Sequence, residues 1–443
     1  MAAGSGGPGA ESRVRTIARR LAGEESSGVR SAPPLSVYVH LPWCIRKCPY
    51  CDFNSHAVLG NSPAVLGNSH AARASSPAAL GNSHASSDGD EVPERRYLDA
   101  LRADLEAALP QVWGRPVQTI FVGGGTPSLF SPESIDALLT MLRTLLPVVP
   151  GAEITMEANP GTFEAARFRA FAQAGVTRLS IGVQSFDDDA LRRIGRVHDA
   201  AQARRAIETA AQHFDSWNLD LMYALPGQTL DALRADLREA LSFAPPHLSY
   251  YHLTLEPNTA FALRPPVLPD EDAASDMQSL IEDETQLAGL QHYEVSAYAR
   301  RHRRCAHNLN YWQFGDYLGL GAGAHGKLSF QDRIVREARV RNPREYMRAA
   351  LGESREGPIA SSHAVPAREL PFEFMLNALR LTDGVPAAWF VERTGLSTLA
   401  IADPVARAVE RGLLDPDPTV YRPTALGARF LNDLQQMFLP EQR

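Results

Sequence analysis

From residue 36 onward, apolar residues alternate between the spacing of strands and the spacing of helices. Short runs of β-branched and aromatic residues predict strands at SVYVHL (36–41), QTIFVGG (118–124), EITMEA (153–158), RLSIGV (178–183), WNLDLMY (217–223), HLSYYHLTL (247–255) and HYEVSAY (292–298). Between these runs, apolar residues recur every three or four positions and predict helices over 95–109, 131–146, 162–175, 199–214 and 229–243.

This alternation of strands and helices predicts an α/β fold with a parallel sheet and helices on its outer face. Six consecutive units fit a partial (β/α)6 barrel better than a closed eightfold one. Polar sequences follow four of the predicted strands, and they are GGGTP, EANP, GVQS and LPGQ. Ligand-binding residues of such barrels collect at this end of the strands, so we expect the functional site there.

The two ends of the chain depart from the alternation. The first 34 residues are rich in Gly, Ser, Ala and Pro, which predicts disorder. A transit peptide is disfavoured because Glu11, Glu24 and Glu25 flank the arginines there. The expected parts are a disordered segment (1–34), the barrel (35–260), a barrel extension (261–341) and an α-rich, winged-helix-like domain (342–443).

A repeat interrupts the barrel sequence after its first strand. NSHAVLG (54–60) is followed directly by NSPAVLG (61–67), and NSHA recurs at 68–71 and 82–85. Small and polar residues at this period cannot form a coiled coil. We therefore expect a low-complexity loop insertion over 54–90, and its histidines are not expected to be ligands.

Composition narrows the possible partners and the compartment. The net charge of −7 argues against a nucleic-acid-binding surface, and no apolar run approaches the ~18 residues of a membrane span. At most transient membrane contact is expected. Three of the four cysteines are crowded together, which favours metal or cluster binding in a reducing compartment over disulfides. A cytoplasmic protein is predicted.

The crowded cysteines are Cys44, Cys48 and Cys51 in CIRKCPYC. A structural zinc site needs four ligands, so zinc would have to recruit Cys305, His40 or His56. A [4Fe–4S] cluster bound by three thiolates instead leaves one iron open for a bidentate ligand such as the amino and carboxylate groups of S-adenosylmethionine. The cluster is favoured because an isolated triplet suits zinc stereochemistry poorly.

The spacing CxxxCxxC at the end of the first predicted strand resembles the radical S-adenosylmethionine superfamily, over roughly 36–260. Further motifs, in order, are YVHLPWC (38–44), VGGGTPS (122–128), EANP (157–160), GVQSF (182–186), LDLMYALPGQT (219–229) and GLGAGAHG (319–326). Together they resemble the oxygen-independent coproporphyrinogen III oxidase group and, within it, the HemW-type haem chaperones.

The resemblance implies that Cys44, Cys48 and Cys51 bind the cluster. The residues implied or suspected to contact S-adenosylmethionine are Tyr38, Tyr50, Gly124, Gly125, Thr126, Glu157, Gln184, Arg196, Asp220 and His325. The backbone of the Gly-Gly-Thr stretch is expected to pair with the methionine amino and carboxylate groups, since glycine permits close approach. From the residues alone, a functional role is favoured for Glu157 over a solvated carboxylate, whereas Arg196 could be a surface charge and its role depends mainly on the resemblance.

The choice between chaperone and oxidase depends on two features. Oxidases of the group carry a further cysteine where this chain has Phe53, and the chaperones carry HNxxYW, matched here by His307, Asn308, Tyr311 and Trp312. The resemblance implies that this segment binds haem, whereas the residues alone favour a structural histidine. We therefore expect a chaperone that passes haem to a haem-accepting protein, over a porphyrinogen oxidase or a zinc-stabilised scaffold.

Overall fold

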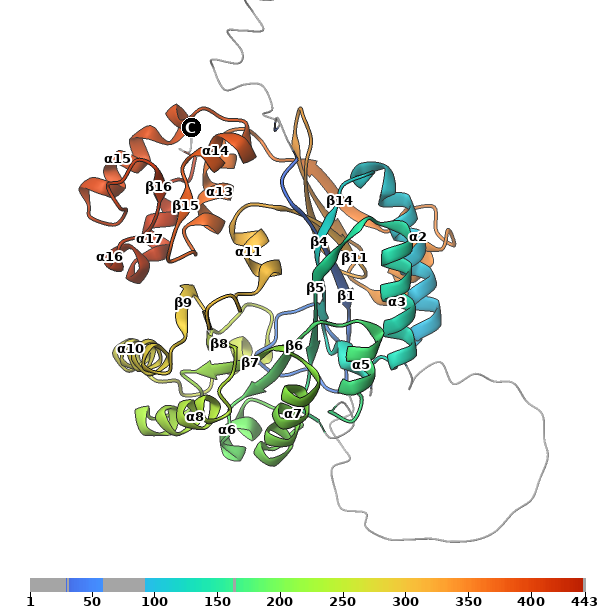
Figure 1. The fold of residues 1–443 in the computed structure, drawn as a ribbon, viewed down its shortest axis with the longest axis horizontal. Coiled ribbons are helices and arrows are strands. Elements are labelled where there is room, and N and C mark those ends of the chain that lie inside the picture. The colour runs from blue at the N-terminus through green and yellow to red at the C-terminus, as the bar shows by residue number, and fades with distance from the viewer. Residues whose placement is uncertain (1–28, 30–31, 59–91, 162–164, 441–443) are drawn as a thin grey trace, which may run out of the picture.

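The computed structural model describes residues 29, 32–58, 92–161 and 165–440. The segments predicted as disordered (1–34) and as a repeated insertion (54–90) lie for the most part outside the described residues. The described chain forms one long, curved sheet of 12 strands with helices on its outer side (Figure 1).

Six adjacent parallel strands make the centre of this sheet. In spatial order they are β1 (Leu35–Leu41), β4 (Val117–Gly124), β5 (Val148–Ala158), β6 (Arg178–Gln184), β7 (Ser216–Tyr223) and β8 (His247–His252). These are the six strands predicted for the barrel. Six of the seven residues of β1 are buried, as expected for a strand covered on both faces.

Further strands extend the sheet at both edges. On one side the order continues through β11 (Asp316–Leu320), which is parallel to β1, and then β12 (His325–Ser329), β13 (Ile334–Arg339) and β14 (Ile359–Ala364). On the other side lie β10 (Ala297–Ala299) and β9 (Gln291–Glu294). The prediction of one strand over 292–298 was wrong, because the chain reverses there and forms two antiparallel strands.

The helices cover the outer face of the sheet (Figure 1). They include α2 (Glu94–Val112), α3 (Pro132–Leu145), α5 (Phe168–Ala174), α6 (Asp188–Arg193), α7 (Ala200–His213), α8 (Leu230–Ser242) and α10 (Glu271–Leu287). Ser131 and Thr229 accept backbone hydrogen bonds at the starts of α3 and α8, and Gly175 ends α5 with φ 104°. Among the described helices, none combines the length and apolar character needed to cross a bilayer.

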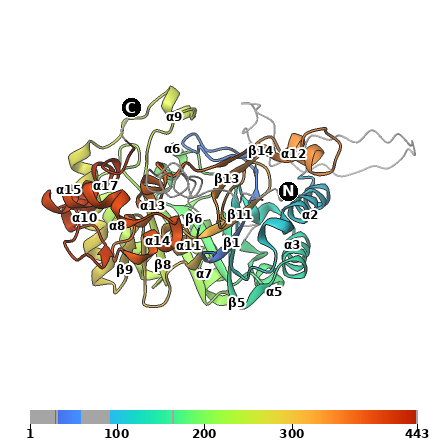
Figure 2. The same cartoon turned by 90° about the horizontal axis from the view of Figure 1, so that it is seen from above.

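A second hydrophobic core lies away from α2 and α3, and it joins the C-terminal helices to Tyr293 of β9 toward one edge of the sheet and to Ile334 of β13 toward the other (Figures 1 and 2). Its elements are α13 (Leu370–Ala378), α14 (Ala388–Thr394), α15 (Ala402–Glu410), α16 (Ala425–Arg429), α17 (Leu431–Gln436) and the β15–β16 pair (Val385–Pro386, Val420–Tyr421). The C-terminal domain was expected to begin at residue 342. However, α12 (Pro343–Ala350) and β14 follow that residue, and β14 pairs with β13 of the large sheet. The helical part therefore begins with α13.

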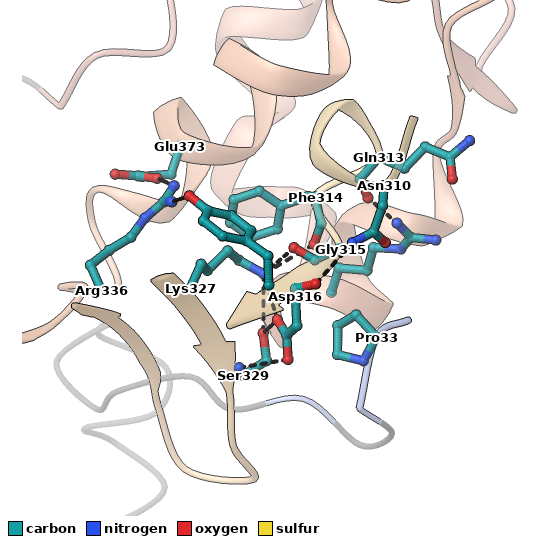
Figure 3. Close-up of polar contacts among 12 residues, drawn as sticks. Pro33, Asn310, Gln313, Phe314, Gly315, Asp316, Lys327, Ser329, Arg336 and Glu373 are labelled. Carbon is teal, nitrogen blue, oxygen red and sulfur yellow. Dashed lines mark hydrogen bonds and ion pairs between the residues drawn. The ribbon is translucent and has the colours of Figure 1, made fainter. Parts of the chain in front are cut away.

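A buried lysine fastens the loop after α11 (Ala306–Trp312) to the sheet (Figure 3). The ammonium of Lys327, 1% exposed, donates to the Phe314 carbonyl at 3.0 Å, to Asp316 Oδ1 at 2.9 Å and to Ser329 Oγ at 3.2 Å. Arg115 forms a second ion pair with Asp316 at 2.9 Å. The position of β11, and of the helix before it, depends on this network.

Replacing Lys327 with methionine is expected to lower the free energy of unfolding by about 3 kcal/mol, because three acceptors lose their donor in a dry environment. Chemical denaturation measures the change. Arg102→Met, which removes a cation from an exposed pair with Glu106, is the control and should cost about 0.5 kcal/mol or less. Equal stability of the two variants would contradict the role given to Lys327.

Candidate functional site

The three clustered cysteines lie in a loop at the end of β1. Cys44 ends the short strand β2 (Trp43–Cys44), which pairs with β3 (His56–Ala57), and Cys48 and Cys51 lie in the loop between. All three are half-buried and free of disulfides. They line one cavity of about 570 Å³, together with residues from the carboxyl ends of β4 to β8.

Each sulfur has a polar partner. Thr126 Oγ1 donates to the sulfur of Cys44 at 3.5 Å, and Arg196 Nη1 donates to that of Cys48 at 3.7 Å. The sulfur of Cys51 lies 3.8 Å from Ser55 Oγ. Asn159 joins the first two donors: its Nδ2 donates to Thr126 Oγ1 at 3.0 Å, and its Oδ1 accepts from Arg196 at 2.6 Å.

Sequence reasoning gave Asn159 no role, although it belongs to the EANP motif. The motif indicated that the segment follows a strand, but not which donors it would reach. By holding Thr126 and Arg196 together, Asn159 aligns the donors of two sulfurs from different parts of the chain. It is therefore a positioning residue for the cysteine loop.

The donor set fits a cluster better than a single ion. Within the described residues, no three His, Cys, Asp or Glu side chains converge as ligands of one metal ion. Three free thiols on one cavity wall, each with one polar neighbour, suit a multi-iron cluster that spans the space between them. Burial raises the pKa of Cys44 to about 11, so the thiol stays protonated unless a metal displaces the proton.

Two glycines allow the cysteine loop to pack against β4. A Cβ on Gly125 would lie 2.5 Å from the Trp43 carbonyl oxygen, and one on Gly124 would lie 2.8 Å from the His40 ring. The amide of Gly125 donates to Leu41 at 2.8 Å. The amides of Gly124 and Thr126 are also used within the protein, since they donate to Glu157 and to the Trp43 carbonyl. All three amides of the stretch thus have acceptors within the protein in this conformation, and the expected pairing of its backbone with the methionine amino and carboxylate groups stays a prediction.

Two carboxyl groups lie on the cavity wall. Glu157 accepts from the Gly124 amide at 2.9 Å, and Asp220 accepts from Ser180 and Asn218, each at 2.8 Å. Burial, reinforced by the charge of Asp220, raises the pKa of Glu157 from its ordinary 4.5 to about 8. Burial also raises the pKa of Asp220. At neutral pH the Glu157 carboxyl is therefore able to donate as well as to accept.

The structure divides the predicted S-adenosylmethionine residues between two cavities. Those on the first cavity are Tyr50, Gly124, Gly125, Thr126, Glu157, Gln184, Arg196 and Asp220. Tyr38 and His325 line instead a second cavity, of about 510 Å³. The two cavities share Asp52, Phe53, Gly124 and Glu157, so they adjoin.

The HNxxYW residues lie on α11, between the barrel and the C-terminal helices (Figure 1). Asn308 lines the first cavity, whereas Tyr311 and Trp312 line the second. His307 lines neither: it is 1% exposed, its Nδ1 lies 2.8 Å from Thr119 Oγ1, and its Nε2 lies 3.0 Å from the Tyr311 hydroxyl. In this conformation His307 has no free nitrogen for iron, and burial lowers its pKa to about 3.

Sequence reasoning missed the polar residues deeper in the barrel. Arg178 and Ser180 on β6, Asn218 on β7 and Ser249 on β8 all line the first cavity. Their signal is a polar residue at alternate positions of an otherwise apolar strand, as in Arg178, Ser180 and Gln184. Such alternation indicates one face of the strand turned toward a polar interior.

Comparisons with known proteins agree with this geometry. The family model of the radical SAM superfamily matches residues 38–240, and that of the HemN C-terminal domain matches 365–430. Coproporphyrinogen III oxidase (HemN) from Escherichia coli has a similar structure, with a TM-score of 0.71 at 20% identity over 97% of this chain and 93% of that one. Fold and family model together define a radical SAM protein.

Curated relatives narrow this class. The heme chaperone HemW of Escherichia coli (strain K12) is 45% identical over 411 residues, which cover 92% of this chain and 99% of that protein. HemW of Bacillus subtilis (strain 168) is 32% identical, again over 92% and 99%. The chain belongs to the HemW heme chaperone family. The resemblance found in the motifs is thus confirmed.

The raised pKa of Glu157 predicts a pH-dependent stability. Between about pH 5 and pH 8 the folded protein keeps a proton that the unfolded chain has released, so this group destabilises the fold increasingly as pH rises. Glu157→Gln should therefore gain stability relative to wild type over this range, measured by urea denaturation at several pH values. Glu208→Gln on the exposed face of α7 controls for loss of a charge. A difference that does not change with pH would contradict the assignment.

Proposed function

We propose that this protein is a haem chaperone, which binds haem and passes it to a haem-accepting protein such as a respiratory one. In this proposal Cys44, Cys48 and Cys51 hold a [4Fe–4S] cluster, and the first cavity binds S-adenosylmethionine. Membership of the HemW family supports the proposal. We also infer a cytoplasmic location, no nucleic-acid partner and at most transient membrane contact, from the charge and the absence of long apolar runs.

The first cavity suits the proposed cofactors. A [4Fe–4S] cluster with three protein thiolates has one iron able to chelate the amino and carboxylate groups of S-adenosylmethionine. Arg196 offers a cation for the carboxylate, Asp220 accepts hydrogen bonds from ribose hydroxyls, and Tyr50 provides an aromatic surface for the nucleoside. Glu157 and Gln184 add a carboxyl and an amide on the same wall.

One observation carries the haem assignment: α11 contributes Asn308 to the first cavity and Tyr311 and Trp312 to the second. The second cavity is rich in aromatic side chains, with Tyr38, Tyr311, Trp312, Tyr317 and Phe53 on its wall. Flat aromatic surfaces suit a planar macrocycle. We place the porphyrin in this cavity.

An imidazole in this cavity is the better candidate for the iron. His325 is exposed, lines the second cavity and forms no side-chain hydrogen bond with the described residues, whereas both nitrogens of His307 are occupied. Partial desolvation of the imidazole against the cavity wall, reinforced by the charges of Arg336 and Arg341, lowers the pKa of His325, which favours the neutral, ligating form. In this arrangement His307 orients the Tyr311 hydroxyl rather than binding iron.

Haem titration of two single variants tests this choice. His325→Ala is expected to weaken haem binding roughly tenfold or more and to shift the Soret band, because an iron ligand is lost. His307→Ala should change affinity less and leave the band position unchanged. The opposite result would assign the iron to His307 and would require α11 to rearrange on binding.

The alternative function is oxygen-independent oxidation of coproporphyrinogen III. It is retained as a candidate because the chain shares its fold with HemN. Anaerobically reconstituted protein should bind haem and show no decarboxylation of coproporphyrinogen on the same sample. Cys48→Ser should lose iron and the brown absorbance of the cluster while keeping its folded structure. Robust decarboxylation would overturn the chaperone proposal, and full iron content in Cys48→Ser would refute the ligand set.

A further inference from the structure

A buried arginine with no hydrogen-bond or ion-pair partner among the described residues lies in the first cavity. Arg178 begins β6 and is 2% exposed, and its guanidinium lines the cavity. Its Nε has no hydrogen-bond partner, and none of the described residues forms a hydrogen bond or an ion pair with the side chain. Longer-range attraction, first from Cys305 and then from Glu153, Tyr293 and Asp220, raises the pKa of Arg178 despite its burial, but neither carboxylate lies within the 4.0 Å of an ion pair.

Other buried cations of the chain are paired. Lys327 is bound to Asp316 at 2.9 Å, and Arg339 contacts Asp104 at 3.2 Å and Glu337 at 2.9 Å. Arg393 donates to the Gln313 carbonyl and stacks on Trp389. Arg178 differs from these three cations. Its lack of a partner among the described residues is therefore not a general feature of buried cations in this protein.

An unpaired buried charge is costly, since it gives up its hydration without a compensating ion pair. An anion that enters the cavity would form the missing ion pair and so stabilise the buried cation. The surrounding groups are suited to such an anion, because Asn308, Asn218, Ser180 and Ser249 line the same cavity with amide and hydroxyl groups.

We propose that Arg178 binds a carboxylate of the ligand that occupies the first cavity. This inference rests on the proposed function, which supplies two candidate carboxylates: that of S-adenosylmethionine in the first cavity, and a propionate that extends into the first cavity from haem in the adjoining second cavity. Arg196 already contacts the Cys48 sulfur, Asn159 and Gly182, and it lies at the cysteine end of the cavity. Arg178 is a second, separate carboxylate site on the barrel strands.

A purely structural role predicts the opposite behaviour on substitution. If Arg178 stabilised the fold through Glu153 and Asp220, removing its charge would lower the melting temperature. If its partner is a ligand anion, Arg178→Met removes a charge that forms no ion pair in the ligand-free protein, which should therefore melt close to the wild-type temperature. Arg339→Met, which breaks a paired buried cation, is the matched control and should melt lower.

Binding measurements identify the carboxylate. S-adenosylmethionine is titrated by calorimetry into reconstituted wild-type and Arg178→Met proteins, and haem and haem dimethyl ester are titrated by absorbance. Loss of the contact should weaken the recognised ligand roughly tenfold to hundredfold. If a propionate is bound, the ester should bind wild type as weakly as haem binds the variant, and the substitution should not weaken the ester further. If the methionine carboxylate is bound, only S-adenosylmethionine should be affected.

The outcomes separate this inference from the proposed function. Normal wild-type binding of both ligands with unchanged affinities in Arg178→Met would overturn the inference alone. A lower melting temperature with unchanged affinities would also overturn it and assign a structural role. Wild-type protein that binds neither ligand would overturn the proposed function and this inference together.

Discussion

The site depends on the close backbone contact between the loop after β1 and the end of β4. The Trp43 carbonyl oxygen lies only 2.5 Å from the position that a Cβ on Gly125 would take, and it accepts a hydrogen bond from the Thr126 amide at 2.7 Å. This contact brings the Thr126 hydroxyl to Cys44 and, through Asn159, brings Arg196 to Cys48. A side chain at Gly125 would separate the two segments, and the three sulfurs would no longer share one cavity. The geometry of the cysteine loop is therefore set by residues far away in sequence.

The positions of α11 and β11 depend on a network of buried charged groups. β11 extends the parallel sheet beyond β1, and the Lys327–Asp316 pair with its backbone acceptors fixes the turn between α11 and β11 (Figure 3). Asn310 on α11 donates to Ser36 Oγ on β1 at 2.9 Å, which joins the helix to the first strand of the barrel. These polar contacts hold Asn308, Tyr311 and Trp312 against the two cavities. A buried network of this kind specifies one position for the helix, because any shift leaves charges unpaired.

Much of the fold follows from local patterns, and much of the site does not. The six parallel strands were predicted because each is a short apolar run between amphipathic helices. The extra strands at the sheet edges are short and partly polar, so their pairing is decided by distant partners rather than by their own sequence. Motifs located most cavity residues, but His325 and Tyr38 lie in a different cavity from the one expected, because the motifs carry no information on side-chain direction. The roles of Asn159 and Arg178 depend on contacts between strands, which spacing along the chain cannot indicate.

The two cavities adjoin, and four residues line both of them. Phe53, 61% exposed, and Asp52 belong to the cysteine loop, and Gly124 and Glu157 belong to the strands beneath it, yet all four line both cavities. A ligand that moves the cysteine loop from one side therefore changes the surface offered on the other. Gly124 and Glu157 add a direct link, because the hydrogen bond between them forms part of both walls. A cofactor bound beside the cysteines and a macrocycle bound beside Tyr311 would accordingly contact the same four groups, and their binding free energies would be coupled through them.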